Sequence, residues 1–251
     1  MRHVKHKVYL NGASLAAADP RIIVLSAREI EPKESVKTMA FGGRDGGFIT
    51  QRRRDEMTVR VEFAIRERLD RAEWNRALMA ARSWCGDGLL TIAERPGQCL
   101  DVICTKLPVA GKKIFDPLTA EFTAYAVPYW RDENANTAQA SAGTDGSLWI
   151  PGDGIPAPVD VTVTAAAAMT GLTVTAGDTS ITLSGISVAQ GGTVVFSHDN
   201  YGFLSIKTGT ASLLNKRTAA SSDDLTIPSG AASAVYVSAC SAVFSARGCY
   251  R

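Results

Sequence analysis

The clearest pattern in the chain is an alternation of apolar and polar positions over residues 57–65. Every second residue is apolar, namely Met57, Val59, Val61, Phe63 and Ile65. Successive side chains of a strand point to opposite faces of a sheet. Period two therefore predicts a strand with one buried face and one solvated face.

A helical period follows. Within residues 71–85, apolar side chains recur at a spacing of three or four, and the positions are Trp74, Ala77, Leu78, Ala81 and Cys85. One stripe at this spacing predicts an amphipathic helix. Asp70 and Glu73 have the spacing of a capping box, and Gly86 and Gly88 are suited to end the helix. We therefore expect a helix over residues 71–84.

Other short apolar segments of the first half are bounded by turn residues and predict further strands. They are residues 4–10, 22–27, 89–93, 100–105 and 118–127. The first ends at Asn11-Gly12, which is typical of a hairpin turn and interrupts the apolar run that a signal peptide would need. Strands around one helix predict a β-sandwich or split barrel with a packed α-helix.

The second half shows strand after strand. Val159, Val161 and Val163 alternate with polar residues, and similar short segments recur with Gly-rich turns about every 8–12 residues. The segments are residues 172–174, 181–183, 193–197, 204–207, 225–227, 234–238 and 243–247. This spacing predicts an antiparallel β-sandwich.

Charge separates the two halves. The chain has 27 Lys+Arg and 25 Asp+Glu, so its net charge of +2 gives no strong field for nucleic acid or an anionic membrane. Residues 1–133 hold 40 of these 52 charged residues, and residues 134–251 hold 12. Residues 134–149 are polar without periodicity. We therefore expect a domain over residues 1–133, a linker over 134–149 and a β-sandwich domain over 150–251.

The segment from Ala27 to Met57 has charged stretches and glycines but little apolar content from which to build a core. Structureless loops longer than about 15 residues are uncommon. We therefore expect an arm or hairpin laid on a neighbouring molecule, with Gly42–Gly47 as its turn.

Chemical motifs are missing from the sequence. It has no phosphate-binding loop, nucleophile elbow or zinc-protease helix. His3 and His6, like Cys99 and Cys104, are spaced to face opposite sides of a strand, so neither pair predicts a metal site or a disulfide. No catalytic, cofactor or metal residue is predicted. Whether Cys240 and Cys249 pair stays open.

Two short segments are left as candidates for contacts. Arg52, Arg53 and Arg54 precede Asp55-Glu56, which favours a locally neutralised, solvated strand end. His198, Asp199 and Tyr201 lie between two predicted strands, where an aromatic ring beside polar groups could contact a sugar. A plain hairpin turn is the simpler interpretation of this second segment.

The layout resembles the distal tail proteins of siphophages. The resemblance rests first on the order of Gly-Arg-Asp-Gly-Gly (43–47), Arg52-Arg53-Arg54, the alternating strand, the helix and Tyr-Ala-Val-Pro-Tyr-Trp (125–130). The runs Gly191–Asp199 and Ser221–Gly230 are similar to the galectin-like C-terminal domain of that family.

This resemblance implies a structural virion protein without a cofactor. Six copies would form a ring at the phage tail tip, assembled in the host cytoplasm. Its partners would be the tail tube protein, the tape-measure protein and the tail-tip adhesin or lysin, with no membrane and no sequence-specific nucleic acid. The arm's charged residues are then candidates for the subunit interface or the ring lumen, namely Arg44, Asp45, Arg52, Arg53 and Arg54.

Two other functions remain open from the residues. The first is a carbohydrate-binding module with a helper domain, which rests on Tyr201, Trp149 and His198. The second is an enzyme whose site converges from scattered residues. It is disfavoured because only three histidines exist and none has the context of a catalytic triad.

Overall fold

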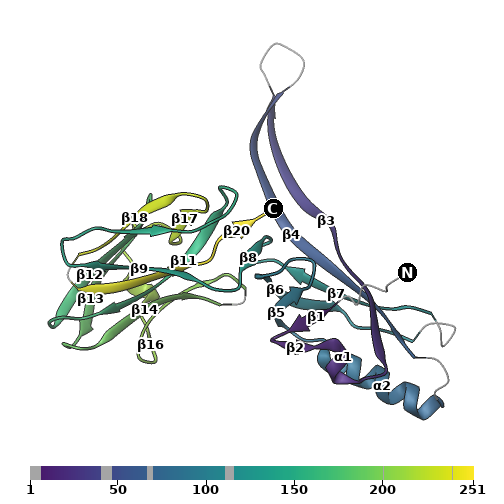
Figure 1. Cartoon of the computed structure of the whole chain (residues 1–251). Helices are drawn as coiled ribbons and strands as arrows, with labels where there is room; N and C mark the ends of the chain where they lie inside the picture. The colour runs from purple at the N-terminus through teal and green to yellow at the C-terminus, as the bar shows by residue number, and fades with distance from the viewer. Residues whose placement is uncertain (1–6, 41–46, 67–69, 111–115, 200, 239) are drawn as a thin grey trace. The chain divides into compact units, whose positions relative to one another are not determined.

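The computed structural model describes residues 7–40, 47–66, 70–110, 116–199, 201–238 and 240–251, and only the backbone of residues 31, 47, 48 and 52. The chain forms two compact units, Met1–Tyr129 and Trp130–Arg251. Antiparallel strands make up most of both (Figure 1). The mainly β fold class predicted from the sequence is confirmed.

The first unit contains an antiparallel sheet in the order β2-β1-β5-β6-β7-β4-β3. Its strands are β1 (Val8–Leu10), β2 (Ala13–Ser14), β3 (Ile22–Ala40), β4 (Gly47–Ile65), β5 (Gly88–Ile92), β6 (Gln98–Lys106) and β7 (Leu118–Ala124). Val59, Val61 and Phe63 of β4 are fully buried, as is Phe122 of β7. The alternation that the sequence predicts for residues 57–65 is therefore the inner face of this sheet.

Helix α2 (Arg71–Trp84) has the predicted bounds. Asp70 Oδ1 accepts a hydrogen bond from Glu73 N at 2.7 Å, and Glu73 Oε2 accepts one from Asp70 N at 3.4 Å, which completes the capping box. The ring of Trp84 meets Phe122 edge-on with 5.7 Å between centroids. The capping box thus starts the helix, and its apolar stripe packs it against the sheet.

The start of the described chain confirms the Asn-Gly turn. Asn11 and Gly12 have φ of 51° and 77°, and they join β1 to β2. Two positive φ values in succession match the right-handed twist of the paired strands. A short helix that the sequence did not predict, α1 (Leu15–Ala18), follows directly and buries Leu15.

Strands β3 and β4 are 19 residues each and form one long hairpin (Figure 1). The segment expected as an arm or hairpin is therefore a hairpin, whereas the strand predicted for residues 22–27 was too short. Four register shifts between Val24 and Thr38 interrupt the alternation of apolar and polar positions. The rest of β3 could therefore not be predicted from a period of two. The expected turn at Gly42–Gly47 lies outside the described residues, except for Gly47, which begins β4.

The second unit packs a sheet in the order β10-β18-β12-β13 with a sheet in the order β16-β15-β14-β11-β19-β9. These strands are β9 (Asn136–Ser141), β10 (Gly146–Trp149), β11 (Pro156–Thr164), β12 (Met169–Ala176), β13 (Thr179–Val188), β14 (Thr193–His198), β15 (Leu204–Thr208), β16 (Ala211–Ser212), β18 (Ala232–Val237) and β19 (Ser241–Ala246). Phe196 and Phe244 are fully buried in this unit. The predicted β-sandwich is confirmed.

Shorter elements complete this unit. β17 (Thr226–Pro228) pairs with β11, and β8 (Trp130–Asp132) pairs with β20 (Cys249–Tyr250). One turn of 3-10 helix, η1 (Leu214–Lys216), lies between β16 and β17.

The predicted linker over residues 134–149 is wrong. It contains β9, which pairs with β19, and β10, which pairs with β18. In β9 the inward positions are held by small residues, and Ala140 is buried opposite Ala242. Alanine alternating with Thr, Gln and Ser is too weakly apolar for a pattern of large hydrophobic residues to identify it as a strand.

All five cysteines are thiols. Cys240 Sγ lies 3.4 Å from Met169 Sδ, and Cys249 Sγ donates to the carbonyl of Arg247 at 3.8 Å. The Cys240–Cys249 pairing that the sequence left open is therefore not formed. Within the described ranges, no helix has both the length and the apolar character needed to cross a membrane.

Candidate functional site

The charged candidates of the arm are not gathered into one cluster. Arg44 and Asp45 lie outside the described residues, as does the side chain of Arg52. Arg53 and Arg54 are neighbours on β4, so their side chains leave opposite faces of the hairpin. The structure thus gives these two arginines different surroundings.

Arg54 is anchored within the first unit. Its Nη1 donates to the carbonyl of Pro128 at 3.3 Å, and its guanidinium lies 4.7 Å from the ring centroid of Tyr129. The Nε of Arg54 is buried and has no hydrogen-bond partner among the described residues. A cation over an aromatic face with a carbonyl contact ties β4 to residues 128–129.

Arg53 stays at the surface and is neutralised locally. Its guanidinium lies 3.0 Å from Asp55 Oδ1, which also accepts from Ser35 Oγ of β3 at 3.1 Å. Lys33 pairs with Glu56 across the same two strands at 2.5 Å, and this hydrogen bond raises the pKa of Lys33. The neutralisation expected from Asp55-Glu56 is therefore present.

A polar pocket of about 320 Å³ lies at the root of the hairpin. Thr123 Oγ1 lies 2.9 Å from Thr58 Oγ1 and 3.0 Å from Thr105 Oγ1, which forms a row of hydroxyls on one wall. Glu121 at its edge pairs with Arg60 at 2.9 Å and Lys106 at 3.3 Å. The pocket offers hydrogen-bond donors and acceptors from four strands, β3, β4, β6 and β7.

Beyond this root the hairpin has no third strand in the described chain. β7 pairs with β4 only from Met57 to Phe63. Farther out, Val36, Met39 and Ile49 are exposed, and Ile49 is 62% exposed. An isolated two-stranded hairpin is marginally stable in water. The exposed apolar side chains on this one therefore favour the interpretation that another molecule covers its surface.

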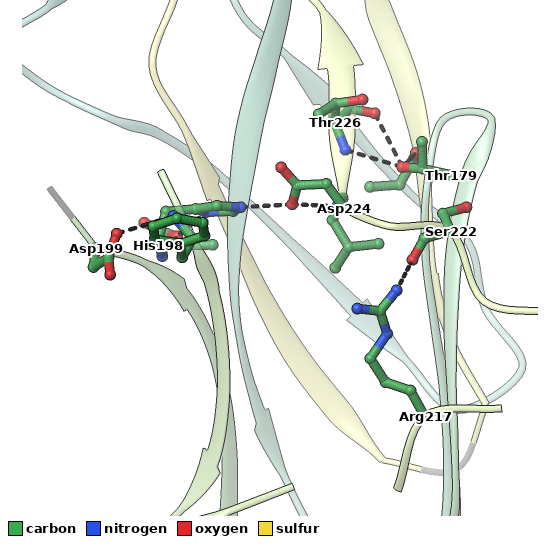
Figure 2. A network of polar contacts seen from close by, with 11 residues as sticks. Thr179, His198, Asp199, Arg217, Ser222, Asp224 and Thr226 are labelled. Atoms are coloured by element: carbon green, nitrogen blue, oxygen red, sulfur yellow. Dashed lines mark hydrogen bonds and ion pairs between the residues drawn. The ribbon is translucent and has the colours of Figure 1, made fainter. Parts of the chain in front are cut away.

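In the second unit, His198 lies between two carboxylates from distant parts of the chain, Asp160 and Asp224. Figure 2 shows its contact with Asp224. Its Nδ1 lies 2.9 Å from Asp160 Oδ1 on β11, and its Nε2 lies 2.6 Å from Asp224 Oδ1. The backbone N–H of His198 also donates to Asp160 Oδ1 at 3.1 Å. Both ring nitrogens are thus engaged within the protein.

This arrangement favours the charged imidazolium. Burial alone would lower the pKa of His198, but the hydrogen bonds to Asp160 and Asp224 outweigh it and raise the pKa to about 9. A neutral imidazole has one N–H, whereas the imidazolium donates to both carboxylates. The group is an ion-paired clamp between strands.

The segment that carries Asp224 is fixed by further polar contacts (Figure 2). Arg217 Nη2 donates to the carbonyl of Ser222 at 2.5 Å, and Ser222 Oγ accepts from Ser180 N at 3.0 Å. Thr179 Oγ1 accepts from Thr226 N at 2.9 Å. These contacts tie residues 217–226 to β13 and so position the Asp224 carboxylate.

The other two candidates for a glycan contact lie in the β14–β15 turn, as the simpler interpretation expected. Asp199 Oδ1 accepts from the backbone N–H of Tyr201 and of Phe203, each at 2.9 Å, so it shapes the turn. Tyr201 and Phe203 are 61% and 71% exposed. Of the three candidates, Asp199 and Tyr201 are exposed, and Tyr201 presents an aromatic ring to solvent.

Sequence reasoning missed the partners of His198. In the sequence, Asp160 is a polar position of the alternating strand at Val159–Val163, and Asp224 is half of the adjacent acidic pair Asp223-Asp224 between two predicted strands. Both descriptions hold locally, since Asp160 is on the outer face of β11 and Asp224 is 38% exposed. Separations of 38 and 26 residues leave no local signal for the contact.

The part of the chain that the structure describes contains no group of three or more His, Cys, Asp or Glu placed to hold a metal ion. Its polar clusters are paired charges and hydroxyl rows.

No protein-family model and no curated protein sequence matches the chain. Among solved structures, it is similar to the Dit protein of phage SPP1, described as a paradigm of the hub adsorption apparatus in phages that infect Gram-positive bacteria. The TM-score is 0.70 at 12% identity, over 96% of this chain and 98% of that one. The fold expected from the resemblance to distal tail proteins is thereby confirmed.

Two structures of the phage P2 baseplate in its activated conformation, with Ca and with Sr, also match. They are 11% and 10% identical, and the matches cover 97% and 96% of this chain and 97% of each of those chains. Their TM-score of 0.49 is too low to support an argument about this fold.

Proposed function

We propose that this protein is a structural component of a siphophage virion, which forms a hexameric ring at the distal end of the tail. The ring would connect the tail tube to the baseplate and its adhesion apparatus. Its partners would be five further copies of itself, the tail tube protein, the tape-measure protein and the tail-tip adhesin or lysin. Assembly would take place in the host cytoplasm.

The observation that carries this proposal is the outer part of the β3–β4 hairpin. It extends past the last residue of β4 that pairs with β7, and it exposes Val36, Met39 and Ile49. Charges beside them, including Arg53 with Asp55 and Lys33 with Glu56, are paired within the hairpin. Ile49 pairs with Thr38 and Phe48 with the next residue, Met39, so Ile49 and Met39 expose apolar side chains on opposite faces of the hairpin. Exposed apolar side chains next to neutralised charges suit a contact with other copies, in which apolar burial adds affinity and charge sets register. Full-length similarity to a hub protein supports the same function.

Mass photometry of the purified protein tests the proposal. A chain of 26.6 kDa is expected to give a species of about 160 kDa, six times the chain mass. Ile49→Asp places a charge in the proposed contact, and we expect it to shift the distribution to the single chain. Phe203→Asp, at an equally exposed apolar residue of the second unit, is the matched control and should leave the assembly intact. A wild-type protein that stays at 26.6 kDa at all concentrations would overturn the ring.

A second function is favoured by one observation. Tyr201 and Phe203 project from one turn, and exposed aromatic rings are the side chains that stack on sugars. A carbohydrate-binding module with a helper domain would then bind glycans as a single chain, through these rings. Glycan-array binding that is lost in Tyr201→Ala, together with a monomeric mass, would favour this alternative over the ring.

A further inference from the structure

The outer face of helix α2 carries three arginines without an acidic partner among the described residues. Arg71, Arg76 and Arg82 are exposed, and the side chain of none of them makes an ion pair or a hydrogen bond with another described residue. The helix contains one acidic residue, Glu73, which forms the capping box with Asp70. The face that α2 turns to solvent is therefore basic.

Arginines on the sheet of the first unit are placed differently. Most of the other described arginines of this unit lie within 3.0 Å of a carboxylate, and these are Arg21, Arg28, Arg53, Arg60 and Arg95. The sheet and its hairpin are thus neutralised within the chain, and the charge of the α2 face is not.

Met79 lies in the middle of this basic face and is 60% exposed. Residues three or four apart are neighbours on the surface of a helix. Arg76 therefore lies one turn before Met79, and Arg82 lies one turn after it. The opposite face of α2 is the buried stripe that packs against the sheet. An apolar side chain with a cation on either side is what α2 presents to solvent.

The stability of the helix does not explain this arrangement. Arg71 is the first residue of α2, where the positive end of the helix dipole disfavours a cation. Arg82 is in the last turn, where the dipole favours one. Arg71 and Arg82 thus have opposite effects on the helix, and what the two share is their place on the outer face.

The composition of the face is that of a protein interface. Arg and Met are enriched in such interfaces, whereas Lys, Asp and Glu are depleted. Residues 71–84 contain no Lys and no Asp, and all their cations are arginines. A guanidinium is more weakly hydrated than an ammonium and binds a carboxylate through two parallel hydrogen bonds. Carboxylates are therefore the groups that this face would pair with.

We propose that the outer face of α2 docks onto an acidic surface of a different protein, which presents carboxylates to Arg71, Arg76 and Arg82 and an apolar contact to Met79. Charge complementarity selects this partner. A lipid surface fits less well, because Met79 is the one large apolar side chain of residues 71–84 that is exposed. Nucleic acid fits less well, because its phosphates would pair with the arginines and leave Met79 uncovered.

Another copy of the first unit is also a poorer partner. The carboxylates on its sheet are already in ion pairs with arginines or lysines, and they include Asp55, Glu56, Glu62 and Glu121. A partner of a different sequence can supply carboxylates that are free. The docking is proposed for α2 and not for the β3–β4 hairpin, so it does not depend on the ring.

Fluorescence anisotropy of the full chain with a labelled peptide tests the docking. The probe is a synthetic helix that carries a row of leucines flanked by glutamates, and the same helix with glutamines in place of the glutamates is its control. We expect the acidic helix to bind and the neutral helix not to bind. Added salt should weaken the binding, because it screens exposed charges. An acidic helix that does not bind would overturn the proposal.

Charge reversal assigns the binding to α2. Arg76→Glu combined with Arg82→Glu should weaken the binding of the acidic helix at least about tenfold. Lys207→Glu combined with Lys216→Glu is the matched control, because it makes the same change in net charge at two exposed residues of the second unit. This control should leave the affinity within about twofold of wild type. Equal weakening by the two double variants would mean that net charge alone attracts the peptide, and it would overturn the proposal.

The same double variants distinguish a different protein from another copy of this chain. In mass photometry, Arg76→Glu combined with Arg82→Glu should give the same mass as wild type, whether or not wild type forms a ring. A mass that falls in this variant alone would assign the α2 face to a contact between copies and would overturn the proposal.

Arginine labelling of the wild type needs no variant. Phenylglyoxal modifies accessible arginine side chains, and mass spectrometry of the digested protein measures the modification at each position. The acidic helix should protect Arg71, Arg76 and Arg82, and it should leave the labelling of Arg53, whose side chain is 70% exposed, unchanged. Binding without protection of the three arginines would overturn the proposal. Duplex DNA or phosphatidylserine vesicles that bind as tightly through the same arginines would overturn it as well.

Discussion

His198 Nε2 lies 2.6 Å from Asp224 Oδ1, although the two residues are 26 positions apart in the chain. On its other side, His198 Nδ1 lies 2.9 Å from Asp160 Oδ1. One imidazolium thereby connects β14, β11 and the segment before β17. The clamp links three separate pieces of the β-sandwich through two charge-assisted hydrogen bonds.

This clamp makes the stability of the second unit depend on pH. The pKa of His198 is raised from 6.5 to about 9 in the folded protein, so the folded state binds the proton more tightly than the unfolded state. Its contribution to the free energy of unfolding is therefore complete below about pH 6.5 and is lost as pH rises through about 9. The pKa change corresponds to about 3 kcal/mol, which solvent at the exposed carboxylates reduces to about 1–2 kcal/mol.

Urea unfolding of wild type and His198→Gln at about pH 6 and about pH 10 measures this contribution. We expect the variant to be less stable at the lower pH and nearly equal to wild type at the higher pH. The same stability difference at both pH values would show that the imidazolium is not the stabilising form.

The two carboxylates are expected to contribute unequally to the pKa of His198. Asp224 is closer to the ring than Asp160, and it is 38% exposed against 58% for Asp160. Less solvent gives a stronger interaction. In NMR titrations, Asp224→Asn should therefore lower the pKa of His198 more than Asp160→Asn does. A larger effect of Asp160→Asn would contradict the geometry, and each variant is the control for the other.

Local signals explain which elements could be predicted from the sequence. The start of α2 depends on Asp70 and Glu73, which are three residues apart, and its stripe repeats within one segment. The β1–β2 turn depends on two adjacent residues, Asn11 and Gly12. In each case the residues that determine the element are neighbours in the chain, so pattern reasoning is sufficient.

Long-range pairing explains the rest. β9 is a strand because β19 supplies its hydrogen-bond partner, and its own alanines carry a weak signal. β3 continues to Ala40 because β4 runs beside it through several bulges. The clamp on His198 also joins residues that are distant in sequence. A single sequence contains no measure of such proximity.

Helix α2 offers a matched pair of substitutions on neighbouring residues. Leu78 faces the sheet and is 7% exposed, whereas Met79 faces solvent and is 60% exposed. Leu78→Ala removes buried methyl groups and leaves a cavity, so it should cost about 2–5 kcal/mol of unfolding free energy. Met79→Ala should change it by less than about 0.5 kcal/mol. Denaturant unfolding measures both, and an unchanged Leu78→Ala would mean that the stripe is not packed.

The two units are expected to differ in their tendency to assemble. Residues 1–129 contain the long hairpin with its exposed apolar side chains, and residues 130–251 close two sheets around a core of their own. A cut between Tyr129 and Trp130 keeps β9 and β10 with the sheets in which they pair, which a cut within residues 134–149 would not. Each fragment then retains its described sheet partners for these strands.

Analytical ultracentrifugation of the two fragments is the measurement. We expect residues 1–129 to sediment as a closed oligomer and residues 130–251 as a monomer, because the hairpin needs partners to cover its exposed apolar side chains. Ile49→Asp in the first fragment should dissociate it, and circular dichroism should show that its strand content is retained. If residues 130–251 assemble and residues 1–129 stay monomeric, the hairpin does not make the ring. The exposed aromatic turn of the second unit then becomes the surface to pursue, and a carbohydrate-binding role moves ahead of the structural one.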